Sequence, residues 1–237
     1  MWTESDRRRT LVEAHRARTQ GDERRAISLY RRILREEPDN YEVSLRVAPL
    51  LAARGQRFEA WQLYRSAGRQ LARSKRYKDC LTIYADACRN VPLEFDVWRL
   101  RAELELMLGR EDVALETLLE GRAHFHEPSS RAQAIALLVR ARMIDPTDPE
   151  IALDLAGLYS QTDQADASLE LLMTLAISGD ASVARRARAL QWRITLAPRH
   201  AWLWLQAGWR TMSSDASLTA IEAGNKPLTR LGFGSDR

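Results

Sequence analysis

One pattern of residues recurs three times in this sequence at a constant interval, and the residue number increases by 54 from one copy to the next. In each copy a small residue is followed by a large one four positions later, a small or apolar one at seven, and proline at twelve. The copies are Ala26/Tyr30/Ile33/Pro38, Cys80/Tyr84/Ala87/Pro92 and Ala134/Leu138/Ala141/Pro146. A fixed period of this kind predicts a solenoid, in which each unit covers its apolar face with the next unit. Solenoids usually bind other macromolecules on their extended surfaces.

Between the repeated positions, apolar residues recur at helical spacing along nearly the whole sequence, and no alternating strand pattern stands out. Breaks rich in Gly, Pro, Ser and Asp separate about twelve segments of helical length. Gly21, Gly55 and Gly109 fall where a helix must end and the chain must reverse. Asp148-Pro149-Glu150 has the residues of a helix start. The sequence therefore predicts an all-α solenoid of about twelve antiparallel helices.

The period also predicts the domain organisation. We expect one solenoid over residues 1–223 and a flexible tail over 224–237. Within the solenoid, the expected parts are a leading helix over 5–19 and three-helix copies over 22–75, 76–129, 130–183 and 184–223. The fourth copy fits only after a deletion of two residues, and terminal units of solenoids are commonly atypical in this way.

The repeated positions resemble those of the tetratricopeptide repeat family, whose unit of about 34 residues forms two antiparallel helices. The residues that carry the resemblance are Ala14, Gly21, Ala26, Tyr30 and Pro38 over 7–40, and Ala48, Leu51, Gly55, Ala60, Tyr64 and Ala67 over 41–75. The resemblance implies a right-handed solenoid without catalytic activity. The spacing departs from the family, since the step from Ala26 to Ala60 equals one such unit but the step from Ala60 to Cys80 is much shorter. The third helix of each copy then ends one hairpin and begins another, either in alternating layers or in armadillo-like triangles.

The large residues of the pattern are expected in the core, because each hairpin leaves an apolar face for the next one to cover. They are Tyr30, Tyr64, Tyr84, Trp98, Leu118, Leu138 and Leu172. Cys80 occupies the small-residue position that Ala26 fills in the first copy, and Cys88 follows on the same predicted helix. We expect both cysteines to be small buried residues in a reducing compartment.

The sequence has few signs of an enzyme or a membrane protein. It lacks a Gly-rich phosphate loop and the His-Glu-x-x-His, Cys-x-x-Cys and Gly-x-Ser-x-Gly motifs. His124 and His126 have no third metal ligand at a suitable spacing. No apolar run approaches the roughly 20 residues of a membrane span, and the N-terminus lacks the apolar part of a secretory signal. We expect a non-catalytic protein of the bacterial cytoplasm, without a metal or cofactor.

The charge is unevenly distributed along the chain. The formal net charge is +4, and it divides into +8 over residues 1–90, −10 over 91–180 and +6 over 181–237. Such a distribution favours an acidic partner at the ends or stacking of the chain on its own copies, although an ordinary solvated surface would also account for it. The acidic middle would repel a phosphate backbone. Nucleic acid is therefore the weaker alternative, and Trp98 with Arg99 and Arg101 after it is only faintly similar to RNA-binding half-repeat proteins.

The family resemblance implies that a protein partner binds the concave face formed by the first helix of each hairpin. The positions carried over are Arg8, Leu11, His15 and Arg18, followed by Glu42, Leu45 and Arg46. If the helix near 57–74 also acts as a first helix, Arg65, Arg69 and Arg73 join them at four-residue spacing, on one side of a helix. Three guanidinium groups repel one another unless an anion lies among them, so an acidic peptide segment or a phosphate is a candidate guest. A solvated outer face is the alternative.

The last clear helix carries a cluster of tryptophans. By the same registration Trp204 is structural, whereas Trp202, Leu205 and Trp209 face the groove. A partner or self-association surface, packing beneath the tail, and a membrane-interface anchor are the three explanations left open. For the whole chain, the leading hypothesis is an adaptor for a protein partner, and the alternative is a self-assembling structural subunit.

Overall fold

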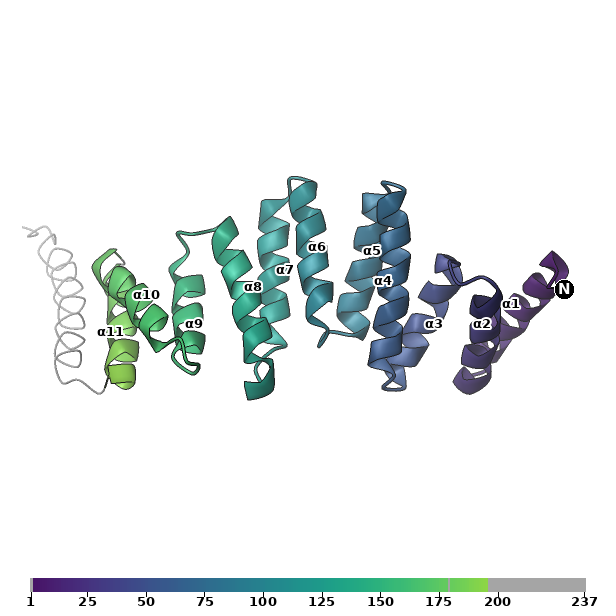
Figure 1. The fold of residues 1–237 in the computed structure, drawn as a ribbon, viewed down its shortest axis with the longest axis horizontal. Helices are drawn as coiled ribbons and strands as arrows, with labels where there is room; N and C mark the ends of the chain where they lie inside the picture. The colour runs from purple at the N-terminus through teal and green to yellow at the C-terminus, as the bar shows by residue number, and fades with distance from the viewer. Residues whose placement is uncertain (1, 179, 196–237) are drawn as a thin grey trace, which may run out of the picture. The chain divides into compact units, whose positions relative to one another are not determined.

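The computed structural model describes residues 2–178 and 180–195, and every regular element in these residues is a helix. The bounds of the helices are α1 Glu4–Thr19, α2 Glu23–Glu36, α3 Tyr41–Ala53, α4 Arg57–Arg73, α5 Tyr77–Asn90, α6 Phe95–Met107, α7 Glu111–Ala123, the 3₁₀ helix η1 Pro128–Ser130, α8 Arg131–Ile144, α9 Pro149–Tyr159, α10 Ala165–Ser178 and α11 Ala181–Thr195. Figure 1 shows them in chain order. The predicted all-α fold is confirmed. Most of the fourth copy and the tail lie outside the described residues.

The helix starts follow the period of the sequence pattern. α2, α5 and α8 begin at 23, 77 and 131; α3, α6 and α9 begin at 41, 95 and 149; α4, α7 and α10 begin at 57, 111 and 165. Each series advances by the same step as the recurring residues do. The helices are therefore equivalent one copy apart, and a residue in α4 can be compared directly with the residue one period later in α7.

The chain divides into two compact units, Met1–Pro146 and Thr147–Arg237. In the first unit each helix from α1 to α7 packs on the next one, and α3 also contacts α5. In the second unit α10 packs on both α9 and α11, and α9 also contacts α11. Helix α4 thus belongs to two hairpins, one with α3 and one with α5, which agrees with the double role expected for the third helix of a copy. A single right-handed solenoid over residues 1–223 stays a prediction.

The core consists of the residues that the repeat assigned to it. Every large residue predicted to be buried has less than a twentieth of its surface exposed: Tyr30, Tyr64, Tyr84, Trp98, Leu118, Leu138 and Leu172. Cys80 and Cys88 are also buried, with free thiols. In the second unit, Leu172 packs in one cluster with Leu153, Ala156 and Val183. The small residues at the repeated positions let the helices approach, and the large residues fill the space between them.

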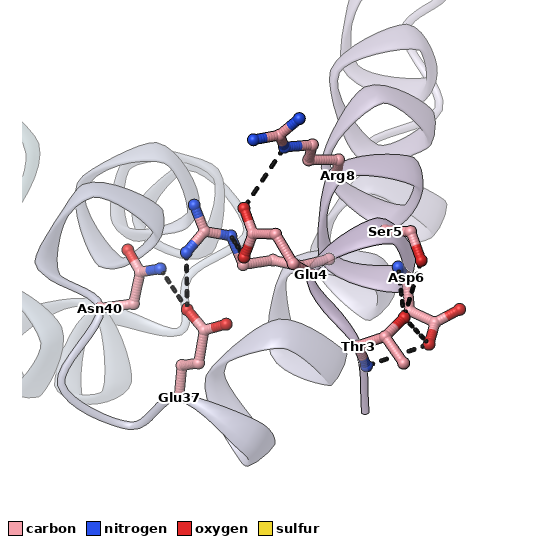
Figure 2. Close-up of polar contacts among 8 residues, drawn as sticks. Thr3, Glu4, Ser5, Asp6, Arg8, Glu37 and Asn40 are labelled. Atoms are coloured by element: carbon pink, nitrogen blue, oxygen red, sulfur yellow. Dashed lines mark hydrogen bonds and ion pairs between the residues drawn. The ribbon is translucent and has the colours of Figure 1, made fainter. Parts of the chain in front are cut away.

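The predicted helix ends are confirmed at their turns and caps. The Asp148 Oδ1 accepts a hydrogen bond from the Glu150 backbone N–H at 2.7 Å, and Pro149 is the first residue of α9. Near the N-terminus, Thr3 and Asp6 cap α1 reciprocally through side-chain and backbone groups, as Figure 2 shows. Gly21, which follows α1, has a φ of +78°. This left-handed conformation strains any residue that carries a Cβ.

Lys75 adopts the same left-handed conformation, with a φ of +58°, at the position one period after Gly21. We expect Lys75→Gly to raise the free energy of unfolding by about 1 kcal/mol, because glycine removes the contact between Cβ and the following carbonyl. Urea unfolding followed by circular dichroism measures the change. Lys75→Ala is the control, since it keeps Cβ and should leave stability nearly unchanged. A Lys75→Gly protein no more stable than the alanine variant would contradict the expectation.

Candidate functional site

Helix α4 has one buried side and one basic side. Its buried residues recur every three or four positions and face α3 and α5: Ala60, Trp61, Tyr64, Ala67, Gly68 and Leu71. Arg65, Arg69 and Arg73 follow a four-residue spacing on another side; Arg69 and Arg73 are exposed and Arg65 is half-buried. The same helical period that buries the apolar residues therefore presents the three arginines together.

The buried side of α4 is held closely against α5. A Cβ on Gly68 would lie 2.5 Å from the Tyr84 hydroxyl oxygen, so the two helices approach at a position where only glycine fits without a shift. The Cys80 thiol donates a hydrogen bond to the Gly68 carbonyl oxygen over 3.3 Å. The Trp61 and Tyr84 rings lie 6.3 Å apart between centroids. These contacts make α4 a rigid support for its arginines.

A buried polar group adds a second connection between α4 and α5. The Tyr64 hydroxyl donates to Asp86 Oδ2 at 2.6 Å, and the Asn90 side-chain amide donates to the Tyr64 oxygen at 3.1 Å. Burial raises the pKa of Tyr64 well above its usual range, and the hydrogen bond to the Asp86 carboxylate is the second largest cause. The phenol therefore remains protonated and keeps its bond to α5 at any physiological pH.

The three arginines line one pocket of about 350 Å³, which we call the arginine pocket. Its other lining residues are Gln62, Ser66 and Gln70 of α4 and Asp39 of the α2–α3 turn. Three positive groups thus share the pocket with one carboxylate and several neutral hydrogen-bonding groups. A pocket of this composition can accept anionic oxygens from a ligand.

The arginines of the pocket have no acidic partner among the described residues, unlike Arg31 and Arg99 of the same unit. In the part of the chain that the structure describes, Arg65, Arg69 and Arg73 form no ion pair. By contrast, Arg31 donates to Glu59 at 2.9 Å, and Arg99 contacts both Asp96 and Glu103 at 2.8 Å. Three guanidinium groups with no ion-pair partner, held along one helix, repel one another and favour an anion between them.

The pocket arginines also affect the pKa of Tyr84, a residue of α5 that packs against the buried side of α4. Burial raises the pKa of Tyr84 to about 12, while the positive charges of Arg69 and Arg65 lower it in part. Tyr84 therefore stays neutral near pH 7, and the two arginines are within electrostatic reach of it. The neutral Tyr84 hydroxyl therefore does not balance the positive charge of the arginines.

The other predicted groove residues lie outside the arginine pocket. Arg8 is exposed on α1 and contacts Glu4 of its own helix at 3.3 Å, as Figure 2 shows. His15 and Arg18 are also exposed on α1, and Arg46 is half-buried on α3. Their roles in partner binding stay predictions. Trp202, Leu205 and Trp209 lie outside the described residues.

Several residues near this site were not singled out from the sequence. Arg7, one position from the predicted Arg8, contacts Glu37 at 3.6 Å. Asn40 donates to the same Glu37 oxygen at 2.7 Å, as Figure 2 shows. These residues line a second pocket of about 470 Å³ that shares Asp39 and Gln70 with the arginine pocket. The lining residues Ser66 and Gln70 of α4 could have been found from the sequence, because they are four positions apart and so lie on one side of the helix beside the arginines. No pattern in the sequence indicates that Asp39 lines the same pocket.

The histidines at the end of α7 have structural neighbours. The His124 ring stacks on Trp98, with 5.1 Å between centroids and 21° between planes. His126 lies 3.6 Å from Glu127 on the surface. Among residues 2–178 and 180–195, no three His, Cys, Asp or Glu side chains are grouped so as to hold a metal ion. No helix in the same residues is long and apolar enough to cross a membrane.

The helical hairpins and their small-to-large contacts agree with a comparison of the sequence with family models. The model described as "Tetratricopeptide repeat" matches residues 129–192, which extend from η1 into α11. These residues are similar to tetratricopeptide repeats. Repeats of this family generally act as scaffolds for protein–protein contacts. No curated protein matches the sequence of this repeat protein.

Solved structures of other proteins align with most of the chain. A MamA crystal structure is 14% identical, with a TM-score of 0.31, and the alignment covers 89% of this chain and 94% of the other. A tetratricopeptide repeat protein from Parabacteroides merdae is 14% identical, with a TM-score of 0.27 and coverage of 87% and 92%. Pseudomonas aeruginosa pilF is 16% identical, with a TM-score of 0.28 and coverage of 86% and 89%.

Proposed function

We propose that this repeat protein is a non-catalytic adaptor of the cytoplasm that binds an acidic segment of a protein partner in the arginine pocket. The observation that carries the proposal is the set of three arginines that line one pocket with no ion pair in the described residues. The general role of the repeat family in protein–protein contacts supports a protein as the partner.

The spacing of the arginines favours a peptide with repeated negative charges. A helix rises about 1.5 Å per residue, so side chains four positions apart are about 6 Å apart along α4. In an extended peptide, side chains two positions apart lie on the same face and are separated by about 6.6 Å. A segment with an acidic residue at every second position could therefore offer one carboxylate to each arginine. Arginine donates several hydrogen bonds in a fixed fork that suits carboxylate oxygens.

The neutral lining of the pocket fits the same guest. Gln62, Ser66 and Gln70 have side-chain donors that can bond the backbone carbonyls of a bound peptide. Asp39 adds a carboxylate that accepts from backbone N–H groups. An extended peptide has both kinds of backbone group along its whole length, whereas a phosphate ion is compact and cannot reach donors and acceptors spread along the pocket. This difference favours a peptide over a phosphate ion.

The test is a charge reversal in the arginine row. We expect Arg65→Glu with Arg69→Glu to weaken the binding of a labelled peptide of alternating Glu and Ser at least about 30-fold, because two charge-assisted contacts become repulsive. Fluorescence anisotropy at low salt measures the affinity. The matched control is Arg24→Glu with Arg25→Glu, which makes the same change in net charge at two exposed positions of α2.

The control separates a site from a general attraction. The α2 variant should bind the peptide about as tightly as the wild type, and thermal unfolding should show that both variants are folded. Equal losses in the two variants would mean that net charge alone holds the peptide. Unchanged binding by the Arg65/Arg69 variant would reject the pocket.

A further inference from the structure

A third pocket of the first unit lies between α6, α7 and α8, and we call it the apolar pocket. Its volume is about 330 Å³, and it shares no lining residue with the arginine pocket. Its apolar lining residues are Ala102 and Leu106 of α6, Leu118 of α7, and Met143 and Ile144 of α8. Leu118 is buried, whereas Met143 is 77% exposed. The pocket therefore opens to solvent beside a large exposed apolar side chain.

The first copy of the repeat has polar, hydrogen-bonded residues at the corresponding positions. Three lining residues of the apolar pocket are each one period after a member of the Tyr64 group: Leu118 after Tyr64, Arg140 after Asp86 and Ile144 after Asn90. In the first copy these polar side chains bond to one another and join α4 to α5. In the second copy α7 still packs on α8, but leucine is smaller than tyrosine and neither leucine nor isoleucine forms hydrogen bonds. The second copy thus lacks the side chains that fill and bond this seam.

Arg140 brings a positive charge to the pocket without a carboxylate to balance it. It is half-buried on α8, lies over the Phe95 ring at 5.9 Å, and donates to a backbone carbonyl of its own helix. Across residues 2–178 and 180–195, Arg140 forms no ion pair. By contrast, Arg99 lines the same pocket and bonds to both Asp96 and Glu103. A half-buried guanidinium with unused donors favours a carboxylate from outside the chain.

We propose that the apolar pocket binds a segment of a protein partner that inserts one large apolar side chain and presents a nearby carboxylate to Arg140. A volume of about 330 Å³ is near the lower end of the range for ligand sites, roughly 300 to 1,000 Å³, so it suits a single side chain. The exposed surfaces of Met143 and Leu106 extend the apolar area beyond the pocket. A peptide would cover them with its neighbouring residues, whereas a small organic acid would not.

The other features of the pocket are compatible with this guest. Met143 is unbranched and flexible, and such a side chain adapts to the shape of an apolar partner. Glu103 is already bonded to Arg99. Glu111 is exposed in the first turn of α7, where the helix dipole stabilises a carboxylate and where water and salt screen its repulsion of the guest. The site adds a second contact to the proposed adaptor and does not depend on the arginine pocket.

Methionine methyl signals in nuclear magnetic resonance spectra test the site directly. The probes are labelled Gly-Ser peptides that carry one Phe and one Glu at increasing separations along the peptide. With at least one of these probes, the Met143 methyl signal of the full chain should shift and saturate. Met173 is the internal control, because it is exposed on α10 of the second unit and should not shift.

The role of Arg140 has its own measurement with the tightest-binding probe. Arg140→Gln removes the charge and keeps the apolar lining, so it should weaken the probe about tenfold. The same peptide with Gln in place of Glu should bind the wild type and Arg140→Gln equally, because neither complex then contains the charge pair. Arg142→Gln is the matched control: it makes the same charge change at a half-buried position of α8 outside the pocket and should leave affinity unchanged.

The first copy also supplies a variant that closes the pocket. Leu118→Tyr, Arg140→Asp and Ile144→Asn together introduce the side chains that fill the corresponding seam between α4 and α5. This closed variant should keep its helix content by circular dichroism, and its Met143 signal should no longer respond to the probe. If the closed variant does not fold, the comparison of Arg140→Gln with Arg142→Gln decides the question by itself.

Three results would overturn the proposal: no Met143 shift with any probe, equal affinity losses in Arg140→Gln and Arg142→Gln, or an unchanged response in the folded closed variant. A Met143 signal that changes with protein concentration alone would assign the pocket to a second copy of the chain instead. Arg65→Glu with Arg69→Glu should leave the Met143 response intact. Failure of the arginine pocket would therefore be distinguished from failure of the apolar pocket.

Discussion

Trp98→Ala should lower the free energy of unfolding by about 3 to 5 kcal/mol, the range found when a large aromatic residue is removed from a core. Trp98 is 1% exposed, and its indole Nε1 donates to the Pro92 carbonyl oxygen at 2.8 Å. Its ring also stacks on His124. Alanine removes the packing of α6 on α7 and leaves the Pro92 carbonyl without this donor. Urea unfolding followed by circular dichroism at 222 nm, a wavelength that reports helix content, measures the loss.

Trp192 provides a matched control for this prediction. It is 45% exposed on α11, so Trp192→Ala removes the same side chain with little loss of buried contact and should cost about 0.5 kcal/mol or less. If Trp98→Ala is no more destabilising than Trp192→Ala, the assignment of Trp98 to the core is wrong. A complete failure of the Trp98 variant to fold would be observed as lost helix signal without denaturant.

Gly121→Ala should destabilise the protein by about 2 kcal/mol, although alanine is the better helix former. A Cβ at Gly121 would lie 2.5 Å from Trp98 Cγ, 2.7 Å from Cδ2 and 2.8 Å from Cβ. These atoms are at the base of a buried side chain, so they cannot move aside without shifting α6 from α7. The cost of overpacking therefore exceeds the gain in helix propensity. The same unfolding measurement detects the loss.

Two comparisons make the Gly121 prediction specific. Gly157, in the last turn of α9, has open space where a Cβ would lie, with no neighbouring atom within 4 Å, so Gly157→Ala should stabilise by about 0.5 kcal/mol. In the Trp98→Ala background, Gly121→Ala should lose part of its penalty, because the contacts with Cγ and Cδ2 are gone and only the contact with Cβ at 2.8 Å remains. An equal effect of Gly121→Ala with and without the Trp98 ring would show that the helices do not approach at this point.

The sequence predicted the fold well because its repeat reflects contacts between residues three or four positions apart in each helix. The recurring small and large residues identify one face of each helix, so Tyr30, Trp98 and Leu172 could be assigned to the core without coordinates. Gly21 marked a turn because few other residues adopt a positive φ. Lys75 was harder to recognise: it has the same conformation at the equivalent position, and only the break in the apolar pattern suggested a turn there.

The candidate site was predictable only in part. The spacing of Arg65, Arg69 and Arg73 placed them on one side of a helix, since side chains four apart always lie together. The contribution of Asp39 depends on how the α2–α3 turn packs beside α4, and no local pattern records that. Arg7, and not its neighbour Arg8, lines the second pocket, because consecutive residues of a helix are rotated by about 100° and point in different directions.

The amino-acid pattern alone was enough to establish the helices, their 54-residue period and the residues that each helix buries, because these depend on interactions over three or four residues. Which charges are neutralised became known only from the folded chain. Arg31 pairs with a carboxylate 28 residues away on α4, whereas the arginines of the pocket form no ion pair in the described part of the chain. Such pairs depend on the distance and angle between helices, and these are properties of the packed hairpins rather than of any one segment.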